Sequence, residues 1–300
     1  MSNKPVVTVD LGGTNLRIAL VVGDEVVNRH IFPTPRGAEA IVGLIAQEAL
    51  AISSASSSDI EGIAIAAPGA ASRKLGGLSK APNLPELNGY PMAAQVTKLT
   101  SLPCIVENDA NAYAAGEVVY GAAKGMQTVV VITLGTGVGG GIVLEGKLWR
   151  GVDGSAAEVG HICIEENGRL CGCGAKGCVE AYSSATSMAK LAREYGVEAS
   201  SAREAYDLAK QGNEAALKAF HRAGTALGIV VAGLVNTLNP QAVVIGGGGS
   251  SSFDLLEPGI WQELKIRAFP VAVENLKLVK CTLKNYAGLL GAAALLRGLA

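Results

Sequence analysis

Residues 151–180 read GVDGSAAEVGHICIEENGRLCGCGAKGCVE, and this stretch decides how the chain is interpreted. Three of the six cysteines, Cys171, Cys173 and Cys178, fall within eight residues, and His161 lies ten residues before the first of them. Three thiolates and an imidazole are a ligand set for a four-coordinate, structural Zn²⁺ ion. Glycines between the cysteines let the backbone turn tightly enough for the thiolates to reach one centre. We therefore predict a structural zinc site, and ligand identity alone leaves another thiophilic metal open.

Buried or disulfide-paired cysteines are the alternative to a metal. Close cysteine spacing with a histidine, in a chain that reads as cytoplasmic, favours a metal over disulfides. The other cysteines, Cys104, Cys163 and Cys281, imply no disulfide framework. Cys163 is conceivable as a substitute ligand, but we expect it to be buried in a strand. A zinc hydrolase would need an open metal position, and four protein ligands leave none.

The pattern from His161 to Glu180, HICIEENGRLCGCGAKGCVE, resembles the ROK family of bacterial sugar kinases and repressors. A second motif, Glu107–Ala112 (ENDANA), resembles the catalytic motif of that family residue for residue. The resemblance covers nearly the whole chain. It implies a two-domain α/β fold of the sugar kinase, Hsp70 and actin-like (ribonuclease H-like) type, with a cleft between the domains. We expect a small α/β domain from residues 1–108 plus 286–300, and a large one with the zinc module from residues 109–285.

Glycine-rich turns follow two strand-like segments, Val6–Leu11 and Thr128–Leu134. Such turns bring backbone amides close to phosphate, because no Cβ atom intervenes, although an ordinary hairpin has the same composition. Their repetition indicates an internal duplication with nucleotide between the two halves. The resemblance implies that Asp10 helps to hold Mg²⁺ through water and that Thr14 contacts phosphate. A third glycine cluster lies between the strand Val243–Ile245 and a helix start, which is a phosphate-binding geometry. The predicted nucleotide-binding set is Asp10, Gly12, Gly13, Thr14, Gly135, Thr136, Gly137, Gly247 and Gly248.

Asp109 follows a short strand, Pro103–Val106, and precedes a helix-forming segment, Ala110–Val119. A helix dipole favours a negative charge at this end, and an ionised carboxylate beside a substrate hydroxyl can act as general base in phosphoryl transfer. In isolation, a helix-capping aspartate is the simpler interpretation. The family motif reverses that preference and makes Asp109 the predicted catalytic base.

The resemblance also assigns sugar-hydroxyl contacts to several side chains. Without the resemblance, we would interpret them as a turn-forming asparagine or as glutamates on the surface. Asn83 lies in Ala81–Pro91, a segment with three prolines that we expect to be a loop. Glu158 and His161, spaced i, i+3, can face one pocket from a helical turn. His161 would bind the metal through one ring nitrogen and a sugar hydroxyl through the other. The predicted substrate-binding set is Asn83, Asn108, Asp109, Glu158, His161 and Glu180.

Together these features predict ATP-dependent phosphorylation of a hexose at its 6-hydroxyl, with glucose as first candidate and Mg²⁺ accompanying ATP. Mannose, fructose and N-acetylmannosamine stay open as substrates, and ADP or polyphosphate stay open as donors. A sugar-sensing ROK regulator without catalysis is the rival from another class. Such repressors carry a DNA-binding segment ahead of the kinase-like part, and we expect none here because the first strand begins at Val6.

Composition limits the partners. The chain has 300 residues, 49% of them hydrophobic, and a net charge of −1, so no basic footprint for nucleic acid is present. Glycines, asparagines or a proline interrupt its most apolar runs, and we expect no membrane-spanning helix or secretory signal. We predict a cytoplasmic protein whose partners are a hexose and ATP, with no nucleic acid and no membrane. The family resemblance favours a homodimer or homotetramer.

Overall fold

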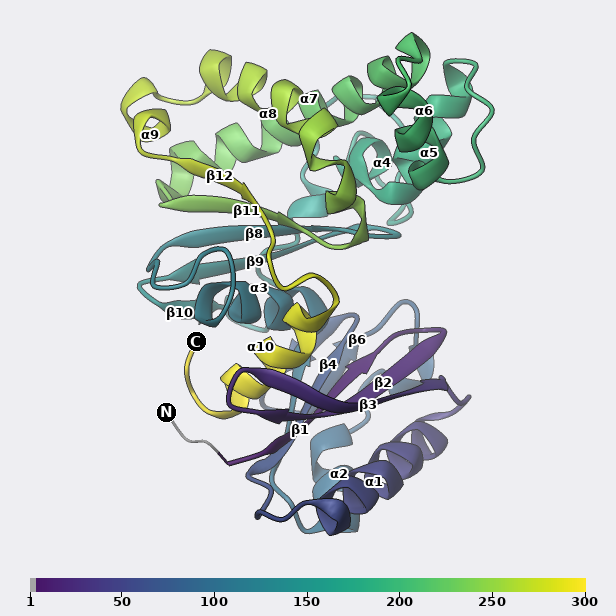
Figure 1. Ribbon diagram of the computed structural model, residues 1–300, viewed down its shortest axis with the longest axis vertical. Helices are drawn as coiled ribbons and strands as arrows, with labels where there is room; N and C mark the ends of the chain where they lie inside the picture. Colours follow the sequence, from purple (N-terminus) through teal and green to yellow (C-terminus); the bar gives the residue numbers. More distant parts are fainter. Residues whose placement is uncertain (1–3) are drawn as a thin grey trace. The chain divides into compact units, whose positions relative to one another are not determined.

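The computed structural model describes residues 4–300, and the chain forms two compact units (Figure 1). One unit holds the described residues up to Gly125, together with Gly141–Ala156 and Asn285–Ala300. The other holds Met126–Gly140 and Ala157–Lys284. The first unit is thus discontinuous, and it extends past residue 108, where the sequence-based boundary was drawn. That boundary stays a prediction.

The first sheet has the strand order β3-β2-β1-β4-β7. Its strands are β1 (Val6–Leu11), β2 (Asn15–Val22), β3 (Glu25–Pro33), β4 (Gly62–Ala67) and β7 (Cys104–Asn108). The first three form an antiparallel meander, and β4 and β7 extend the sheet in parallel from β1. β4 is buried along its whole length, as expected for a parallel strand with both faces covered. The strands predicted near Val6, Leu16 and Ile60 are confirmed to within two residues.

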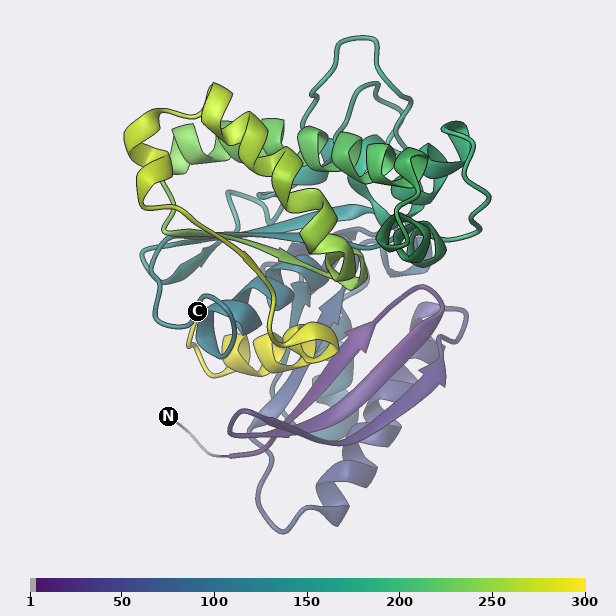
Figure 2. The same cartoon turned by 45° about the horizontal axis from the view of Figure 1, so that its top comes forward.

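Helices cover both faces of this sheet (Figures 1 and 2). They are α1 (Ala38–Ala55), α2 (Met92–Thr100), α3 (Asp109–Val119) and α10 (Ala287–Leu296). α1 packs into the core through Ile41, Ile45 and Ile52, which share one helix face. α10 packs against β1, β4 and α3. Its Gly291 permits that approach, because a Cβ there would lie 1.7 Å from the Ala112 carbonyl oxygen.

Short elements link β4 to α2. They are a hairpin of β5 (Ala70–Ser72) and β6 (Gly77–Lys80), followed by a 3-10 turn, η1 (Pro85–Leu87). The predicted loop at Ala81–Pro91 is therefore irregular apart from this turn, and the hairpin is an element that the sequence did not reveal.

The second sheet has the strand order β10-β9-β8-β11-β12. Its strands are β8 (Val129–Leu134), β9 (Val138–Leu144), β10 (Lys147–Trp149), β11 (Ala242–Gly246) and β12 (Lys277–Lys280). In each sheet the first strand in sequence stands at the centre, its hairpin partners lie on one side, and two parallel strands lie on the other. This shared order is what the predicted duplication requires.

The second unit carries most of the helices. They are η2 (Val159–His161), α4 (Glu180–Ser183), α5 (Ala185–Glu194), α6 (Ala202–Lys210), α7 (Glu214–Leu238), η3 (Gly248–Ser252), α8 (Phe253–Arg267), α9 (Pro270–Glu274) and, at the boundary, η4 (Lys284–Tyr286). α7 and α8 lie side by side (Figures 1 and 2). Their backbones approach closely at Gly224, where a Cβ would lie 2.2 Å from the Leu256 carbonyl oxygen.

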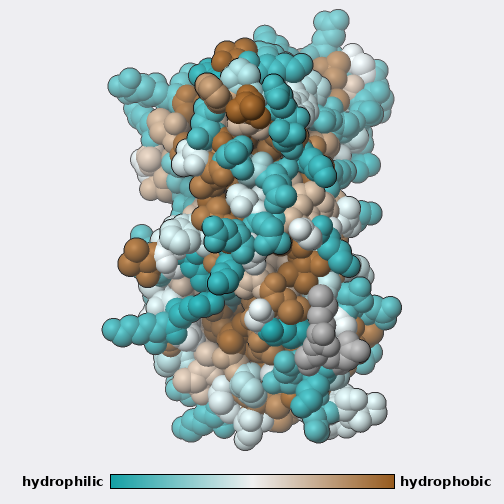
Figure 3. Space-filling model, turned by 90° about the vertical axis from the view of Figure 1, so that its left-hand side faces the viewer, coloured by the Kyte–Doolittle hydropathy of each residue, from teal (hydrophilic) through white to brown (hydrophobic). Residues whose placement is uncertain are grey.

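Within residues 4–300, two helices, α1 and α7, are long and apolar enough to cross a membrane by length and composition alone. Of their apolar windows, 33% and 61% are buried. α1 packs on the first sheet, and α7 packs against α5, α6 and α8. Figure 3 shows hydrophobic and hydrophilic side chains interspersed over one face of the molecule.

Candidate active site and metal centre

The predicted site residues of the first unit follow the ends of its parallel strands. In the strand register Asp10 pairs with Ala66, and Ala66 pairs with Glu107. Asp10 and the Asn108–Asp109 junction therefore lie at the carboxyl edge of one sheet, where open α/β sheets bind ligands. Asn83 belongs to the same edge, because its carbonyl oxygen lies 3.5 Å from the position of a Cβ on Gly13.

Asp109 is the first residue of α3, and it is exposed. The helix cap is its neighbour Asn108, whose Oδ1 accepts a 2.9 Å hydrogen bond from the Asn111 amide. The Oδ1 atom of Asp109 accepts from the Ala110 amide at 2.8 Å. The capping role that competed with catalysis in the sequence thus belongs to Asn108. The dipole of α3 favours a negative charge at Asp109, which suits a proton acceptor.

The two asparagines of this edge differ in how their side chains are used. Besides capping α3, Asn108 donates from Nδ2 to the Gly69 carbonyl at 3.0 Å. Asn83 is exposed, and its side chain makes no hydrogen bond among residues 4–300. The turn-forming asparagine of its loop is Asn88, which accepts a 2.6 Å hydrogen bond from the Ala81 amide. The sugar contacts predicted for Asn83 and Asn108 stay predictions.

Sequence reasoning missed Arg17, the ion-pair partner of Asp10. Arg17 Nη1 lies 2.7 Å from Asp10 Oδ2, and the two residues are directly opposite in the β1–β2 hairpin. A cross-strand pair of opposite charges is a common stabilising contact, and the symmetric spacing around the glycine turn could have revealed it. The pair leaves Asp10 half-exposed beside the turn.

In the first glycine turn, one backbone amide is already engaged in a hydrogen bond within the turn. The Gly12 amide donates to the Asn15 carbonyl at 2.9 Å, and Thr34 Oγ1 donates to the Gly12 carbonyl at 2.6 Å. Donors to a phosphate would therefore come from Gly13 and Thr14, which are exposed, rather than from Gly12.

The second and third glycine clusters leave the same edge of the second sheet. β8 and β11 are parallel neighbours with Thr133 opposite Gly246, so the Gly135–Gly137 turn and Gly247–Gly248 lie at adjacent strand ends. Gly247 has a φ of +74°, and a Cβ on it would lie 2.5 Å from the Leu134 carbonyl oxygen. The positive φ and the close approach of Leu134 therefore require glycine at position 247. Gly248 is exposed with open space around it, as a ligand contact requires.

The four predicted metal ligands come together in the second unit. The donor atoms of His161, Cys171, Cys173 and Cys178 all lie within 4.8 Å of one another. Cys171 Sγ is 3.7 Å from His161 Nδ1, and Cys173 Sγ is 3.8 Å from Cys178 Sγ. A tetrahedral zinc–thiolate site with bonds of about 2.3 Å has an S···S edge of about 3.8 Å. The donor set and its spacing therefore fit a four-coordinate thiophilic metal.

Two local features bring these ligands together. Residues 162–164 and 177–179 form a short antiparallel bridge, with Val179 N donating to the Ile162 carbonyl and Ile164 N to the Gly177 carbonyl. The bridge places Cys178 beside His161. Between them the chain turns at Gly174, which has a φ of +93°, and Cys171 N donates to the Ala175 carbonyl. Glycine is favoured where φ is positive, which explains the glycine-rich spacing.

Cys163 does not join the cluster. It is exposed, and its Sγ lies 3.6 Å from the carbonyl oxygens of Glu165 and Lys176. The expectation that it is buried was wrong, because the segment from His161 to Cys163 lies at the surface. Cys171 is buried instead, and burial raises the pKa of its thiol to about 12. Cys104 is half-buried, and burial raises the pKa of its thiol to about 12, which argues against a nucleophilic role.

Glu180 connects the metal cluster to the second glycine turn. Its Oε1 lies 3.3 Å from Cys171 Sγ, and its Oε2 accepts a 2.9 Å hydrogen bond from the Val138 amide. A Cβ on Gly137 would lie 2.4 Å from that same Oε2, so a larger residue there would have to displace the Glu180 carboxylate. Glu158 is exposed and directly precedes η2, where the His161 amide donates to the Glu158 carbonyl at 3.1 Å. The sugar contacts of Glu158, His161 and Glu180 stay predictions.

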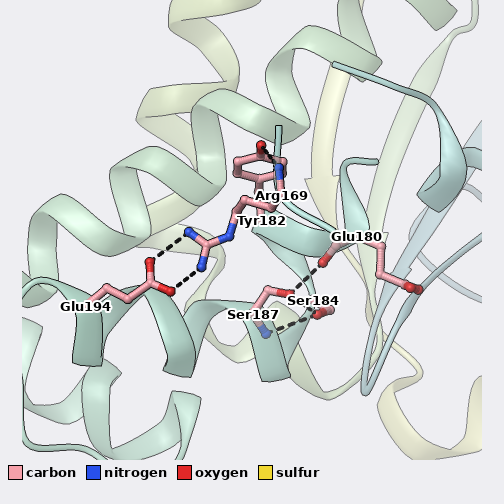
Figure 4. A network of polar contacts seen from close by, with 6 residues as sticks. All are labelled: Arg169, Glu180, Tyr182, Ser184, Ser187 and Glu194. Carbon is pink, nitrogen blue, oxygen red and sulfur yellow. Dashed lines mark hydrogen bonds and ion pairs between the residues drawn. The ribbon is translucent and has the colours of Figure 1, made fainter. Parts of the chain in front are cut away.

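Tyr182 anchors the ligand loop to the helices (Figure 4). Its hydroxyl accepts from the Arg169 amide at 2.9 Å and donates to Glu165 Oε2 at 2.6 Å. The Arg169 guanidinium lies over the Tyr182 ring and pairs with Glu194 of α5. In Figure 4 the Glu180 carboxylate points away from this network, while its backbone carbonyl accepts from Ser187 Oγ at 2.7 Å. The loop and the Glu180 backbone are thus fixed by neighbouring contacts.

These two sheets with their glycine turns define a sugar kinase of the actin-like class. A crystal structure of a ROK family glucokinase from Streptomyces griseus, in complex with glucose and AMPPNP, has the same fold, with a TM-score of 0.82 and 32% identity over 98% of this chain and 99% of that one. The ROK family model matches residues 6–298, and the chain belongs to the ROK family. It is 34% identical to a glucokinase of Thermotoga maritima, over 99% of this chain and 98% of the relative. It is also 35% identical to an N-acetylmannosamine kinase of Shigella flexneri, over 98% of each.

Proposed function

We propose that this protein is a hexose kinase that transfers the γ-phosphoryl group of ATP to the 6-hydroxyl of glucose. The observation that carries the proposal is the position of Asp109, exposed at the first turn of α3 and at the same sheet edge as Asp10 and the first glycine turn. An ionisable acceptor beside a phosphate-binding turn is what transfer to an alcohol requires. Similarity to two kinases of hexoses supports the same reaction.

In this proposal Asp109 accepts the proton of the 6-hydroxyl as its oxygen attacks phosphorus. The bond from the γ-phosphorus to the bridging oxygen breaks, and ADP leaves with the electron pair. The amides of Gly13 and Thr14 lie on an exposed turn and would donate to phosphate oxygens, which stabilises charge that spreads over them. Gly135–Gly137 and Gly248 would serve the nucleotide in the same way. Asn83, Asn108, Glu158, His161 and Glu180 would orient the sugar hydroxyls.

A magnesium ion accompanies ATP in this proposal, and Asp10 would hold it through water. Magnesium is typically bound by one or two carboxylates plus substrate phosphates, and the half-exposed Asp10 beside the glycine turn fits that pattern. The ion would neutralise charge on the transferring group. Arg17 keeps the Asp10 carboxylate oriented by the 2.7 Å ion pair.

We assign zinc to His161, Cys171, Cys173 and Cys178, as a structural ion with all four positions filled by protein. A closed site has no place for a bound water, so the metal would hold the ligand loop and neighbouring Glu180 in place and take no chemical step. Support comes from the interatomic distances and from the thiol-rich donor set.

N-acetylmannosamine is the second candidate substrate, because a kinase of that sugar shares 35% sequence identity with this chain, against 34% for the glucokinase of Thermotoga maritima. Mannose and fructose belong in the same comparison, while ADP and polyphosphate stay open as donors. We further propose a cytoplasmic homodimer or homotetramer with no nucleic-acid or membrane partner, in keeping with the near-neutral charge.

The experiment that tests this function is an assay of ADP release across glucose, mannose, fructose and N-acetylmannosamine, with sugar binding measured in parallel by calorimetry. The highest kcat/KM should belong to glucose, with ATP and Mg²⁺ required. A higher kcat/KM for N-acetylmannosamine would replace the substrate assignment. Binding of a sugar without any ADP release would instead favour a sugar-sensing regulator.

A further inference from the structure

The junction between β7 and α3 contains a buried carboxylate that the proposed mechanism does not use. Glu107 is the residue before the helix cap, and it is 5% exposed. A buried carboxylate is costly unless it is paired and fully hydrogen-bonded. Its position two residues before Asp109 makes its partners relevant to catalysis.

Three donors satisfy Glu107. Oε1 accepts from the Asn108 amide at 3.0 Å and from Asn111 Nδ2 at 3.1 Å. Oε2 accepts from Arg150 Nε at 2.5 Å, and the Arg150 side chain is 15% exposed. Arg150 also donates from Nη1 to the Leu148 carbonyl at 3.3 Å, which ties it to β10.

These bonds fix the backbone on both sides of Asp109. The preceding residue, Asn108, is held by Glu107 through its amide, by Gly69 through Nδ2 and by Asn111 through Oδ1. The residue two positions later, Asn111, is held by Glu107 through its side chain. Asn111 is 2% exposed, and its Oδ1 has no hydrogen-bond partner among residues 4–300. The side-chain amide of Asn111 thus donates to Glu107 through Nδ2 while its Oδ1 atom is left without a hydrogen bond, which is a cost to stability.

We propose that the Arg150–Glu107 ion pair is the positioning device for the general base Asp109. Arg150 touches neither substrate nor reacting atoms in this proposal. It neutralises the buried carboxylate and thereby keeps Asn108, and with it the Asp109 side chain, in the orientation that proton transfer needs. The inference rests on the proposed function for its kinetic consequence, but the tether itself is a property of the folded chain.

The test compares Arg150→Met with the double variant Glu107→Gln/Arg150→Met. Arg150→Met leaves a buried carboxylate unpaired, and we expect kcat for glucose to fall about 100-fold, as small displacements of catalytic groups do, with little change in the KM for glucose. The double variant removes the unpaired charge while a glutamine oxygen still accepts from Asn108 and Asn111, so it should recover part of the lost kcat. Arg203→Met, which breaks an exposed helix-surface pair, is the matched control and should behave as wild type.

Hydrogen exchange gives a readout that does not depend on turnover. Amides at the start of α3, Asn108 and Asn111 in particular, should exchange faster in Arg150→Met than in wild type or in the control. Unchanged exchange there, or a double variant with kcat no higher than that of Arg150→Met, would overturn the proposal. If Arg150→Met does not fold, Arg150→Lys replaces it, because lysine keeps the charge but lacks the Nε geometry. If Asp109→Asn kept full activity, Asp109 would not be the general base. The hydrogen-exchange result would still test whether the Arg150–Glu107 ion pair holds the start of α3.

Discussion

At the residue scale, Ala157 has a backbone conformation that suits glycine better. Its φ is +66°, and it directly precedes Glu158. A left-handed conformation costs a non-glycine residue about 1–2 kcal/mol, while replacing alanine by glycine costs about 0.4–1 kcal/mol through the unfolded chain. Ala157→Gly should therefore stabilise the protein by about 0.5 kcal/mol in urea unfolding. Ala156→Gly, where φ is not positive, is the control and should destabilise it; equal destabilisation of both variants would show that the conformation carries no strain.

Cysteine identity at the metal centre gives a second test at this scale. Cys173→Ser removes one of four donors, whereas Cys163→Ser removes an exposed thiol outside the cluster. We expect Cys173→Ser to lose bound zinc and to bind glucose more weakly, because the ligand loop loses its support. Cys163→Ser should keep both. Metal content by elemental analysis and sugar binding by calorimetry provide the check, and a metal-free Cys173→Ser with unchanged glucose affinity would separate the metal from the sugar site.

At the scale of elements, the loop that carries the cysteines depends on Tyr182. Its hydroxyl bridges the Arg169 amide and Glu165, and the guanidiniums of Arg169 and Arg222 both lie over its ring. Tyr182→Phe keeps the ring but leaves two polar groups without this partner, so we expect a loss of about 1–3 kcal/mol of stability. Tyr206→Phe removes a hydroxyl that makes one exposed hydrogen bond, to Asp254 Oδ2 at 3.3 Å. The free energy of unfolding of this variant should stay within about 0.5 kcal/mol of wild type. Equal effects of the two substitutions would count against the anchoring role of Tyr182.

Arg297 joins distant elements of the first unit. Its side chain is 2% exposed, and its guanidinium donates to the carbonyls of Lys4, Val21 and Gly23. Arg297→Met should cost about 1–3 kcal/mol in the free energy of unfolding, because three carbonyl acceptors, two of them part-buried, lose a charged donor. Arg203→Met offers an exposed comparison expected to change little. An Arg297→Met protein as stable as wild type would mean that water replaces the guanidinium at no cost.

At the scale of the whole molecule, the sequence predicted what depends on local pattern. The strands, the two glycine turns and the four predicted metal ligands follow from spacing along the chain. The structure confirms the strands and brings the four predicted ligands together. The β5–β6 hairpin was missed because its strands are three and four residues long, too short for a periodic pattern. Arg150, the partner of Glu107, was missed because that contact spans 43 residues, which a single sequence does not encode locally. Arg17, the partner of Asp10, lies at the symmetric position across the glycine turn, so the hairpin spacing does encode it.

At two strand ends, helix capping and turn formation belong to a different polar residue from the one that the sequence suggested. In isolation Asp109 was more simply interpreted as a helix cap, and only the side-chain geometry shows that Asn108 fills that role. In the same way, Asn88 rather than Asn83 closes the turn of its loop. Both ambiguities arise because adjacent polar residues at a strand end have similar propensities, and hydrogen bonds decide between them.

The central claim is that Asp109 acts as the general base, and it is tested most directly by the turnover of Asp109→Asn with glucose and ATP. Asparagine keeps the size of the side chain but cannot accept the proton, so kcat should fall by about 10²–10⁴-fold, with glucose affinity measured by calorimetry largely kept. Asp59→Asn, an exposed carboxylate in another loop, controls for the loss of one negative charge. An Asp109→Asn enzyme that phosphorylates glucose at the wild-type rate would contradict the account.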